Sequence, residues 1–484
     1  MIEKMPTQVP GLDEVLEGGI PLSSTILVAG PPGAGKTVLA NQIAFRNARP
    51  DCPVLYVTTA SEPLARMLRF MQQFEFFAPE KVGKHVVWED VGPMLLSSES
   101  DSDAIAWLSE QVLERQPALL VVDSFKALIE INGNHRALRR ALYQFAGRLA
   151  TIDCVTLLVG EYAPGETAAG SPEISIVDGI IQLSVRPMGL RDRRSLRVQK
   201  LRGSGYLPGE HSLRISKSGV EVFPRFRTPV EPTFYVASTE RAPTWIQGLD
   251  EMFCGGPLRG TTTLVLGDPG VGKTVTSLHF LLNAAMRGEP GVFVSFQEDP
   301  NQLRQIAKNF GFDLQDLESR GLVAMFYTSP VELDIDEHFP KIARLIERVR
   351  ARRVVIDSVT DFEAGAFFDQ ERYFNYVYSL VQWFKDSGVS AMLTAQTSEM
   401  FGNSLILTGK GISHIADNLV VLRYVPKGPE IRRAIAVLSS RGSDHSKQVR
   451  EYIISEERGP VVGEPMEASM PLLGIAPRDG NEPA

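Results

Sequence analysis

The sequence predicts an α/β protein built from two tandem copies of one domain, each a mostly parallel β-sheet flanked by helices. The first observation is a repeat: GLDEVLEGGIPLSSTILVAGPPGAGKT at 11–37 is matched without a gap by GLDEMFCGGPLRGTTTLVLGDPGVGKT at 248–274. The second is that short runs rich in Val, Ile and Leu alternate with helical patterns in each half. That order is typical of a parallel sheet covered on both faces. Because the repeat is domain-sized, it indicates a duplication rather than a solenoid.

The elements can be taken in order along the first half. A strand is expected at 25–30 and a helix at 36–48, followed by a strand at 54–59 and a second helix. Further strands are expected at 118–124 and 155–161, with another helix between them. Shorter apolar runs after residue 180 predict strands added near one edge of the sheet.

The domain boundaries follow from the repeat and from proline-rich stretches. The sequence predicts a first domain at 1–225, a linker at 226–240, a second domain at 241–464 and a short flexible tail at 465–484.

Composition excludes several classes of protein. The net charge is −8, so a surface that coats nucleic acid is not expected. Cys52, Cys154 and Cys254 are far apart, which disfavours a disulfide framework and a zinc ribbon. No apolar run approaches the roughly 18 residues of a membrane span, and the start has no signal-peptide pattern. A soluble cytoplasmic protein without a membrane partner is expected.

Both halves contain the phosphate-binding pattern G-x-x-x-x-G-K-[ST] between a strand and a helix. Its glycines let backbone N–H groups converge on phosphate oxygens, its lysine reaches the β- and γ-phosphates, and its hydroxyl ligates Mg²⁺. We therefore expect ATP and Mg²⁺ to bind in each half. The expected nucleotide-binding residues are Gly30, Gly33, Gly35, Lys36 and Thr37 in the first half, and Gly267, Gly270, Gly272, Lys273 and Thr274 in the second.

An aspartate ends a later apolar strand in each half, and the two are Asp123 and Asp357. A carboxylate at this place holds Mg²⁺ through water, so these residues join Thr37 and Thr274 as the expected metal-binding set. A serine follows each aspartate, so the catalytic glutamate is expected at the end of a neighbouring strand instead.

In the second half that neighbouring strand end offers Glu298 as the base that activates water. The ungapped alignment places Ser61 opposite Glu298, and the first half offers only Glu62, one position later. We therefore expect slow turnover, mostly in the second half, with the first half holding ATP structurally. Glu62 and Asp299 are open to another interpretation, as charges at a helix N-terminus beside a proline.

Lys200 and Arg202 alternate on a predicted strand and therefore share a face. Two cations that project together could reach the γ-phosphate of a neighbouring subunit. The second half keeps only Arg441, since Ser439 replaces the lysine. The alternative is that these are solvated charges on an edge strand.

The doubled GLDE and phosphate-loop pattern, the VxxDS strand ends, KLRG/SSRG and ISHIADNLVVLRYV…REYIIS together resemble the KaiC family of circadian clock proteins over about 6–460. The resemblance implies two RecA-like ATPase domains in a two-tiered homo-hexamer, with ATP between adjacent subunits. It also implies a KaiB-like or other signalling protein as partner, and autophosphorylation in the second domain. The acceptors would be Ser413 and, as a lesser site, Thr408, while His414 stands at the second acceptor position. Paired glutamates of the family are replaced by Ala60-Ser61 and Gln297-Glu298.

The leading expectation is thus an ATP-binding, slowly hydrolysing hexameric ATPase of signalling or clock type, with serine autophosphorylation in the second domain. Two alternatives stay open. One is a RecA-like motor or recombination ATPase that acts on nucleic acid, and the other is a nucleotide-locked scaffold with little turnover.

Overall fold

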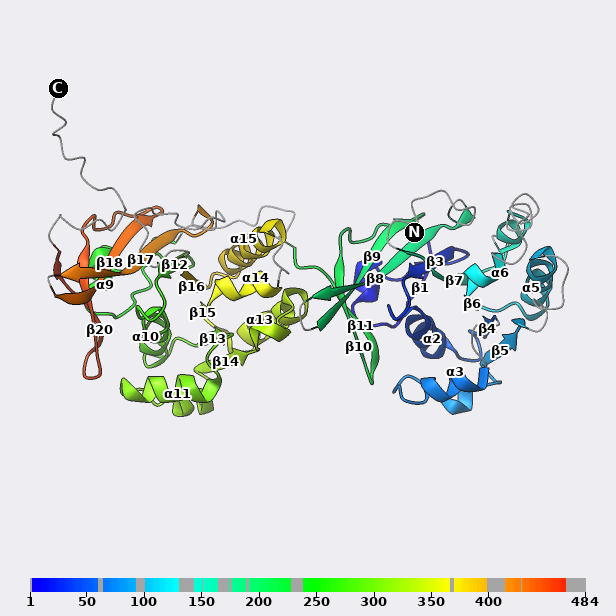
Figure 1. The fold of residues 1–484 in the computed structure, drawn as a ribbon, viewed down its shortest axis with the longest axis horizontal. Helices are drawn as coiled ribbons and strands as arrows, with labels where there is room; N and C mark the ends of the chain where they lie inside the picture. The colour runs from blue at the N-terminus through cyan, green and yellow to red at the C-terminus, as the bar shows by residue number, and fades with distance from the viewer. Residues whose placement is uncertain are drawn as a thin grey trace, which may run out of the picture. The chain divides into compact units, whose positions relative to one another are not determined.

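The protein divides after Arg225 into two compact units, which are treated one at a time (Figure 1). The structure is a computed structural model that describes residues 2–59, 64–92, 101–129, 143–149, 151–163, 174, 176–188, 191–227, 238–365, 370–397, 414–427 and 429–466.

The first unit contains a long twisted sheet. Its strands are β3 (Thr25–Gly30), β4 (Val54–Thr58), β5 (Val86–Asp90), β6 (Leu119–Asp123), β7 (Val155–Glu161), β8 (Gly179–Met188), β9 (Arg191–Leu201), β10 (His211–Ser216) and β11 (Gly219–Phe223). Within the described residues the sheet has nine strands in the order β11-β10-β9-β8-β3-β7-β6-β4-β5. Neighbours from β8 to β5 pair in parallel, whereas β9, β10 and β11 are added antiparallel at one edge. A separate antiparallel pair is formed by β1 (Lys4–Met5) and β2 (Ile20–Pro21).

Helices cover both faces of this sheet. They are α1 (Leu12–Val15), α2 (Lys36–Asn47), α3 (Leu64–Met71), η1 (Pro79–Lys81), α5 (Asp101–Arg115) and α6 (Phe125–Ile129). Successive residues of β6 belong to different cores, because side chains alternate along a strand. Val121 packs in a cluster with Ile43 of α2, while Val122 packs in another cluster with Leu108 of α5.

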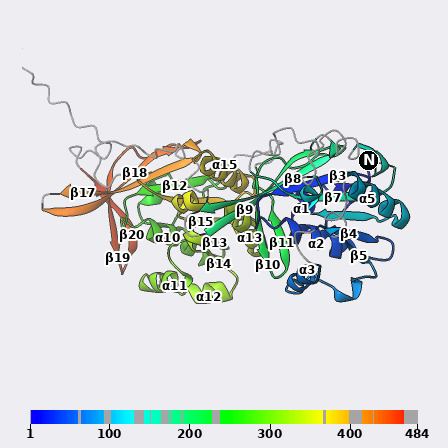
Figure 2. The same cartoon turned by 45° about the vertical axis from the view of Figure 1, so that its right-hand side comes forward.

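The second unit repeats this architecture. Its strands are β12 (Thr262–Gly267), β13 (Gly291–Ser295), β14 (Val323–Tyr327), β15 (Arg353–Asp357), β16 (Ser390–Gln396), β17 (Asn418–Lys427), β18 (Glu430–Ser440), β19 (Arg450–Ser455) and β20 (Gly459–Pro465). In the described part they form a nine-stranded sheet ordered β14-β13-β15-β16-β12-β17-β18-β19-β20, which is the order of the first unit. The antiparallel strands β17 and β18 form a long ribbon at one end of the unit (Figure 2).

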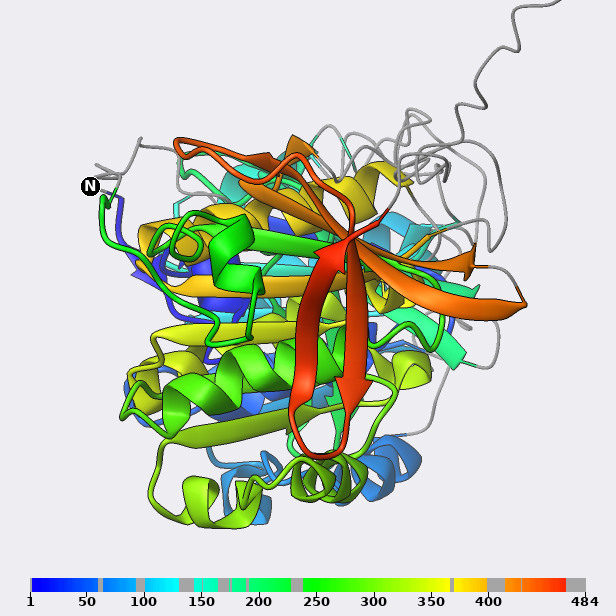
Figure 3. The ribbon, with the colours of Figure 1, turned by 90° about the vertical axis from the view of Figure 1, so that its left-hand side faces the viewer.

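The helices of the second unit are α9 (Leu249–Met252), α10 (Lys273–Ala285), α11 (Pro300–Asn309), α12 (Leu314–Ser319), η3 (Pro330–Glu332), α13 (Ile335–Val349), η4 (Val359–Asp361), α14 (Phe362–Gly365) and α15 (Gln370–Asp386). Figure 3 shows α10, drawn in green, lying over the sheet on the side that faces the viewer. The predicted fold class, two tandem α/β domains with mostly parallel sheets, is therefore confirmed.

The structure also gives contacts near the predicted domain boundaries. Phe226, the first residue of the predicted linker, packs its ring 3.8 Å from that of Phe339 and donates its N–H to Asp336 at 3.1 Å. At the other end, β20 continues to Pro465, one residue beyond the predicted domain end. Among the described residues, no helix combines the length and the apolar character needed to cross a bilayer.

Candidate functional site

In each unit a glycine-rich loop joins the central strand to the helix that follows it. In the first unit the loop links β3 to α2, and in the second it links β12 to α10. Gly33 and Gly270 share a φ of 74°, a left-handed conformation that favours glycine. Gly35 and Gly272 are the N-cap residues of the two helices and also have positive φ. Both loops therefore end at a helix N-terminus, whose unpaired N–H groups bind phosphate readily.

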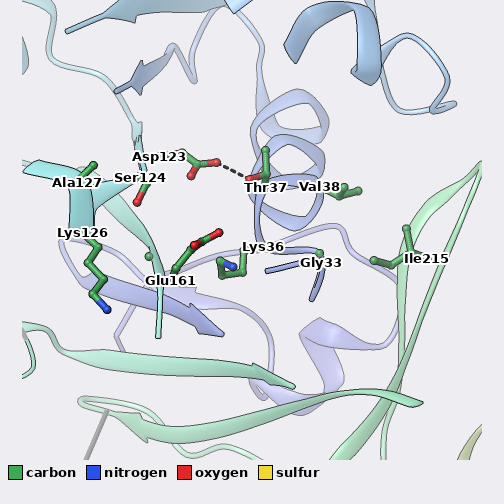
Figure 4. Close-up of a pocket in the computed structure, with 12 residues that line it drawn as sticks. Gly33, Lys36, Thr37, Val38, Asp123, Ser124, Lys126, Ala127, Glu161 and Ile215 are labelled. Carbon is green, nitrogen blue, oxygen red and sulfur yellow. Dashed lines mark hydrogen bonds between the residues drawn. The ribbon is translucent and has the colours of Figure 1, made fainter. Parts of the chain in front are cut away.

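The first loop borders a pocket of about 600 Å³ (Figure 4). Thr37 donates its hydroxyl to Asp123 over 2.7 Å, and Lys36 donates to the Pro31 carbonyl oxygen over 2.9 Å. The pocket is lined by Gly33, Gly35, Lys36, Thr37, Val38, Asp123, Ser124, Lys126, Ala127, Gly160, Glu161 and Ile215.

The second loop borders an equivalent pocket of about 300 Å³. Lys273 donates to the carbonyl oxygens of Gly267 and Asp268, each at 2.8 Å. The lining residues are Pro269, Gly270, Gly272, Lys273, Thr274, Val275, Gln297, Glu298, Asp357, Ser358 and Gln396.

Burial controls the charges in both pockets. It lowers the pKa of Lys36, an effect opposed first by Glu161 and then by Asp123. It raises the pKa of Asp123 and of Asp357, and hydrogen bonds from neighbouring hydroxyl groups oppose that rise. Asp357 is thus a buried carboxylate and Asp123 a half-buried one, and a nearby cation favours the ionised form of each.

The residues present fit Mg²⁺ with its shell of water. Asp357 is only 5% exposed, and its Oδ2 has no hydrogen-bond partner among the described residues. Oxygen donors from a carboxylate and a hydroxyl group are those that Mg²⁺ accepts. Thr37 with Asp123, and Thr274 with Asp357, are the side chains that would hold it.

The two aspartates receive hydrogen bonds from residues that the sequence did not single out. Tyr56 of β4 donates its buried hydroxyl to Asp123 at 3.1 Å, and Asn41 donates to the Tyr56 oxygen. In the second unit the hydroxyl of Thr394 on β16 donates to Asp357 instead. In the sequence these contacts were indicated only by a tyrosine within one apolar strand and a threonine within another.

The expected base of the second half, Glu298, lines the second pocket. Burial and the nearby Asp357 raise its pKa. Asp299, by contrast, is the N-cap of α11 and accepts backbone N–H groups of Asn301 and Gln302, so its geometry is that of a helix cap. The first-half candidate, Glu62, lies outside the described residues.

The predicted cations make contacts within their own units. Lys200 donates to the Val177 carbonyl oxygen at 2.6 Å, and Arg202 pairs with Asp178 at 3.6 Å. Neither lines the first pocket in this structure.

In the second unit Arg441 donates to the backbone carbonyl oxygen of His414 over 2.7 Å. His414 itself is exposed. The phosphoacceptor candidates Ser413 and Thr408 lie outside the described residues.

One pocket carboxylate was missed altogether. Glu161 is the last residue of β7 and lines the first pocket, where Figure 4 shows its carboxylate between Asp123 and Lys36. Its counterpart at the end of β16 is Gln396, which lines the second pocket. In the sequence, the glutamate that ends the apolar run VTLLVGE was the feature that could have indicated this residue.

Comparison with known proteins gives one consistent result. A family model for the KaiC ATPase matches residues 5–227 and again 242–467. The circadian clock oscillator protein KaiC of Acaryochloris marina is 29% identical over 473 residues, which cover 95% of this chain and 88% of that protein. The protein of the same name from Nostoc is 28% identical over 479 residues, with 95% and 89% coverage. KaiC 1 of Synechocystis is 28% identical over 467 residues, with 94% and 88% coverage.

Proposed function

The chain belongs to the KaiC ATPase family, and from that premise we propose that it is a slow, Mg²⁺-dependent clock-type or signalling ATPase of the cytoplasm. The observation that supports this most directly is the pairing in each pocket of a phosphate-loop lysine and threonine with a buried strand-end aspartate. The names of its relatives support a clock-type role.

For the second site we propose the following roles. The oxygen of water attacks the γ-phosphorus of ATP, the bond to the bridging oxygen of ADP breaks, and Glu298 accepts the proton that the water loses. Its raised pKa makes Glu298 a stronger base than an exposed glutamate. Lys273 balances charge on the β- and γ-phosphates. When bound at Thr274 and Asp357, Mg²⁺ supplies further neutralisation.

Radiolabelled ATP tests this assignment. Wild type should release phosphate in a Mg²⁺-dependent reaction, and Glu298→Gln should lose most of the turnover that remains when the first loop is disabled by Lys36→Ala. Loss of a positioned base typically costs about 10²–10⁴ in rate. If Glu298→Gln hydrolyses ATP at the unchanged rate, Glu298 is not the base. Bound nucleotide without any phosphate release would indicate a scaffold.

We further propose an ATP-dependent homo-hexamer in which Lys200, Arg202 and Arg441 reach the nucleotide of the adjacent subunit. Their present contacts are few and mostly to backbone oxygens, so replacing these contacts with contacts to phosphate costs little free energy. Nucleotide bound at an interface stabilises that interface by linkage, so Lys36→Ala should weaken assembly. Light scattering at saturating Mg-ATP measures the mass. A monomer under these conditions contradicts the proposal.

Autophosphorylation of Ser413, with Thr408 as a lesser site, is the second activity that the family suggests. Gln297 cannot accept a proton, and its amide donates to Asp361 at 3.0 Å, so wild-type transfer should be slow. Gln297→Glu should raise the rate. Intact-mass spectrometry after long incubation with Mg-ATP decides the matter: an unmodified mass for both proteins leaves an ATPase without kinase activity.

A KaiB-like or other signalling protein is the partner we propose. The competing proposal, a motor on nucleic acid, finds little support in a chain of net charge −8. Stimulation of hydrolysis by DNA would favour that motor.

A further inference from the structure

Glu161 is a carboxylate of the first pocket that comes from β7, not from the strand whose end the sequence predicted to supply the base. The six residues before it in β7 are buried, and Glu161 alone in that strand is exposed, where it lines the pocket. The end of β16 shows the same burial pattern, with Gln396 as the exposed residue.

The backbone of Glu161 is fixed against the phosphate loop. In the parallel pairing of β3 and β7, Glu161 lies opposite Gly30, the first glycine of the loop. The N–H of the next residue, Tyr162, donates to the Gly30 carbonyl oxygen over 3.1 Å. The strand pairing therefore fixes the backbone of Glu161 beside the first residue of the loop.

The surroundings leave the carboxylate free to act on a ligand. Across the described residues, no hydrogen bond or ion pair engages its oxygens. Its charge nevertheless acts on Lys36 more strongly than that of Asp123 does. Glu161 therefore shares the pocket with Lys36, the group expected to reach the β- and γ-phosphates (Figure 4).

The two sites are complementary in this respect. In the second site Glu298 follows β13 and Gln396 ends β16. In the first site the ungapped alignment places Ser61 opposite Glu298. Glu161 ends β7 as Gln396 ends β16. Apart from the metal-binding aspartate, each site thus has one pocket carboxylate among the described residues.

We propose that Glu161 is the proton acceptor of the first site, so that the first unit also hydrolyses ATP. The water oxygen attacks the γ-phosphorus, the bond to the ADP oxygen breaks, and the Glu161 carboxylate takes the proton and later releases it to solvent. This inference rests on the proposed ATPase function and departs from the expectation that the first half only holds ATP.

The test isolates the first site with Lys273→Ala, which disables the second loop. In that background Glu161→Gln should lower kcat at least about tenfold. Affinity for a fluorescent ATP analogue should stay the same or increase, because the substitution removes a negative charge that faces the triphosphate. Adding Ser61→Glu to Glu161→Gln should restore part of the turnover, since it places a carboxylate at the position that aligns with Glu298 of the second site.

Glu89→Gln is the matched control, because Glu89 lies on β5, pairs with Arg115 of α5 and does not line the pocket. It should leave kcat unchanged. The inference is overturned if Lys273→Ala alone abolishes hydrolysis, or if Glu161→Gln keeps its kcat. It is also overturned if Glu161→Gln weakens ATP binding at unchanged kcat, which would make Glu161 a positioning residue for Lys36. Absence of hydrolysis in wild type would instead refute the proposed function itself.

Discussion

Single hydroxyl groups distinguish two sites that otherwise share one plan. Tyr56 donates to Asp123 from one neighbouring strand, and Thr394 donates to Asp357 from the strand on the other side. The residue of the second unit that aligns with Tyr56 is Phe293, which has no hydroxyl group. Besides the threonine of its phosphate loop, each aspartate thus has a hydroxyl donor from a different neighbouring strand.

Tyr56→Phe should weaken binding of Mg-ATP in the first site. A hydrogen bond to a charged group contributes about 1.5–3 kcal/mol, and without it burial raises the pKa of Asp123 further. The expected loss in affinity is about tenfold, measured with a fluorescent ATP analogue in the Lys273→Ala background. Phe293→Leu in the Lys36→Ala background is the control, since its ring donates nothing. Unchanged affinity in Tyr56→Phe would mean that Asp123 does not need the phenol.

His211 makes the stability of the first unit depend on pH. The ring is completely buried, with Nε2 3.0 Å from the Leu207 carbonyl oxygen and Nδ1 accepting the N–H of Arg225 at 3.0 Å. An Nδ1 that accepts carries no proton, so the ring is neutral. Burial accordingly lowers the pKa of His211 below its usual 6.5.

Below about pH 6.5 the unfolded chain therefore binds a proton that the folded unit does not, and the free energy of unfolding should fall as the pH drops. Urea unfolding at pH 7.5 and pH 5.5 measures the difference. In His211→Gln, which donates but cannot be protonated in this range, the difference should be smaller. An equal pH dependence in both proteins would exclude His211 as its source.

At the scale of elements, the carboxylate of Asp299, close to the second pocket in sequence, caps helix α11. Asp299 accepts the N–H groups of Asn301 and Gln302, and the Gln302 side chain accepts the N–H of Asp299. These reciprocal bonds form a capping box, which satisfies N–H groups that a helix start leaves unpaired.

Asp299→Ala should therefore lower the free energy of unfolding by about 1 kcal/mol. Asp299→Asn should lower it much less, because asparagine is also a good cap. Neither substitution should change kcat. Chemical denaturation and phosphate release measure the two quantities. A large fall in kcat for Asp299→Asn at unchanged stability would indicate a catalytic role for Asp299.

The elements themselves were largely predictable from the sequence. Apolar runs gave the parallel strands and the added edge strands, although β5 (Val86–Asp90), with its mixed VVWED, was missed. The phosphate loops follow from a local pattern of residues. Tyr56, Thr394 and Glu161 could not be found in this way, because their roles depend on which strands are neighbours in the sheet. β7 lies beside β3, yet more than a hundred residues separate them in the chain.

At the scale of the whole molecule, each unit has its own buried clusters and its own nucleotide pocket. Binding energy should therefore stabilise the unit in which it is released. Ligand at 100 times its Kd adds about 2.7 kcal/mol to the stability of the form that binds it.

Hydrogen exchange read by mass spectrometry can locate this effect. With saturating Mg-ATP, Lys36→Ala should lose protection in β3 and α2 but keep it in β12 and α10, and Lys273→Ala should show the reverse. Wild type with and without nucleotide is the reference. Equal loss of protection in both units for either variant would show that the sites are not independent.

The opposite placement of the hydroxyl donors limits how the protein can be recombined. If the segment around β4 were exchanged for that around β13, Phe293 would replace Tyr56, and Asp123 would keep the hydroxyl of Thr37 but have no donor from a neighbouring strand, since Val159 offers none. In the reciprocal product Asp357 would have two strand donors, since Tyr56 would join Thr394. The interchangeable module is thus the whole sheet with its loop, and crossovers between the two copies inside a sheet should yield proteins with one impaired site.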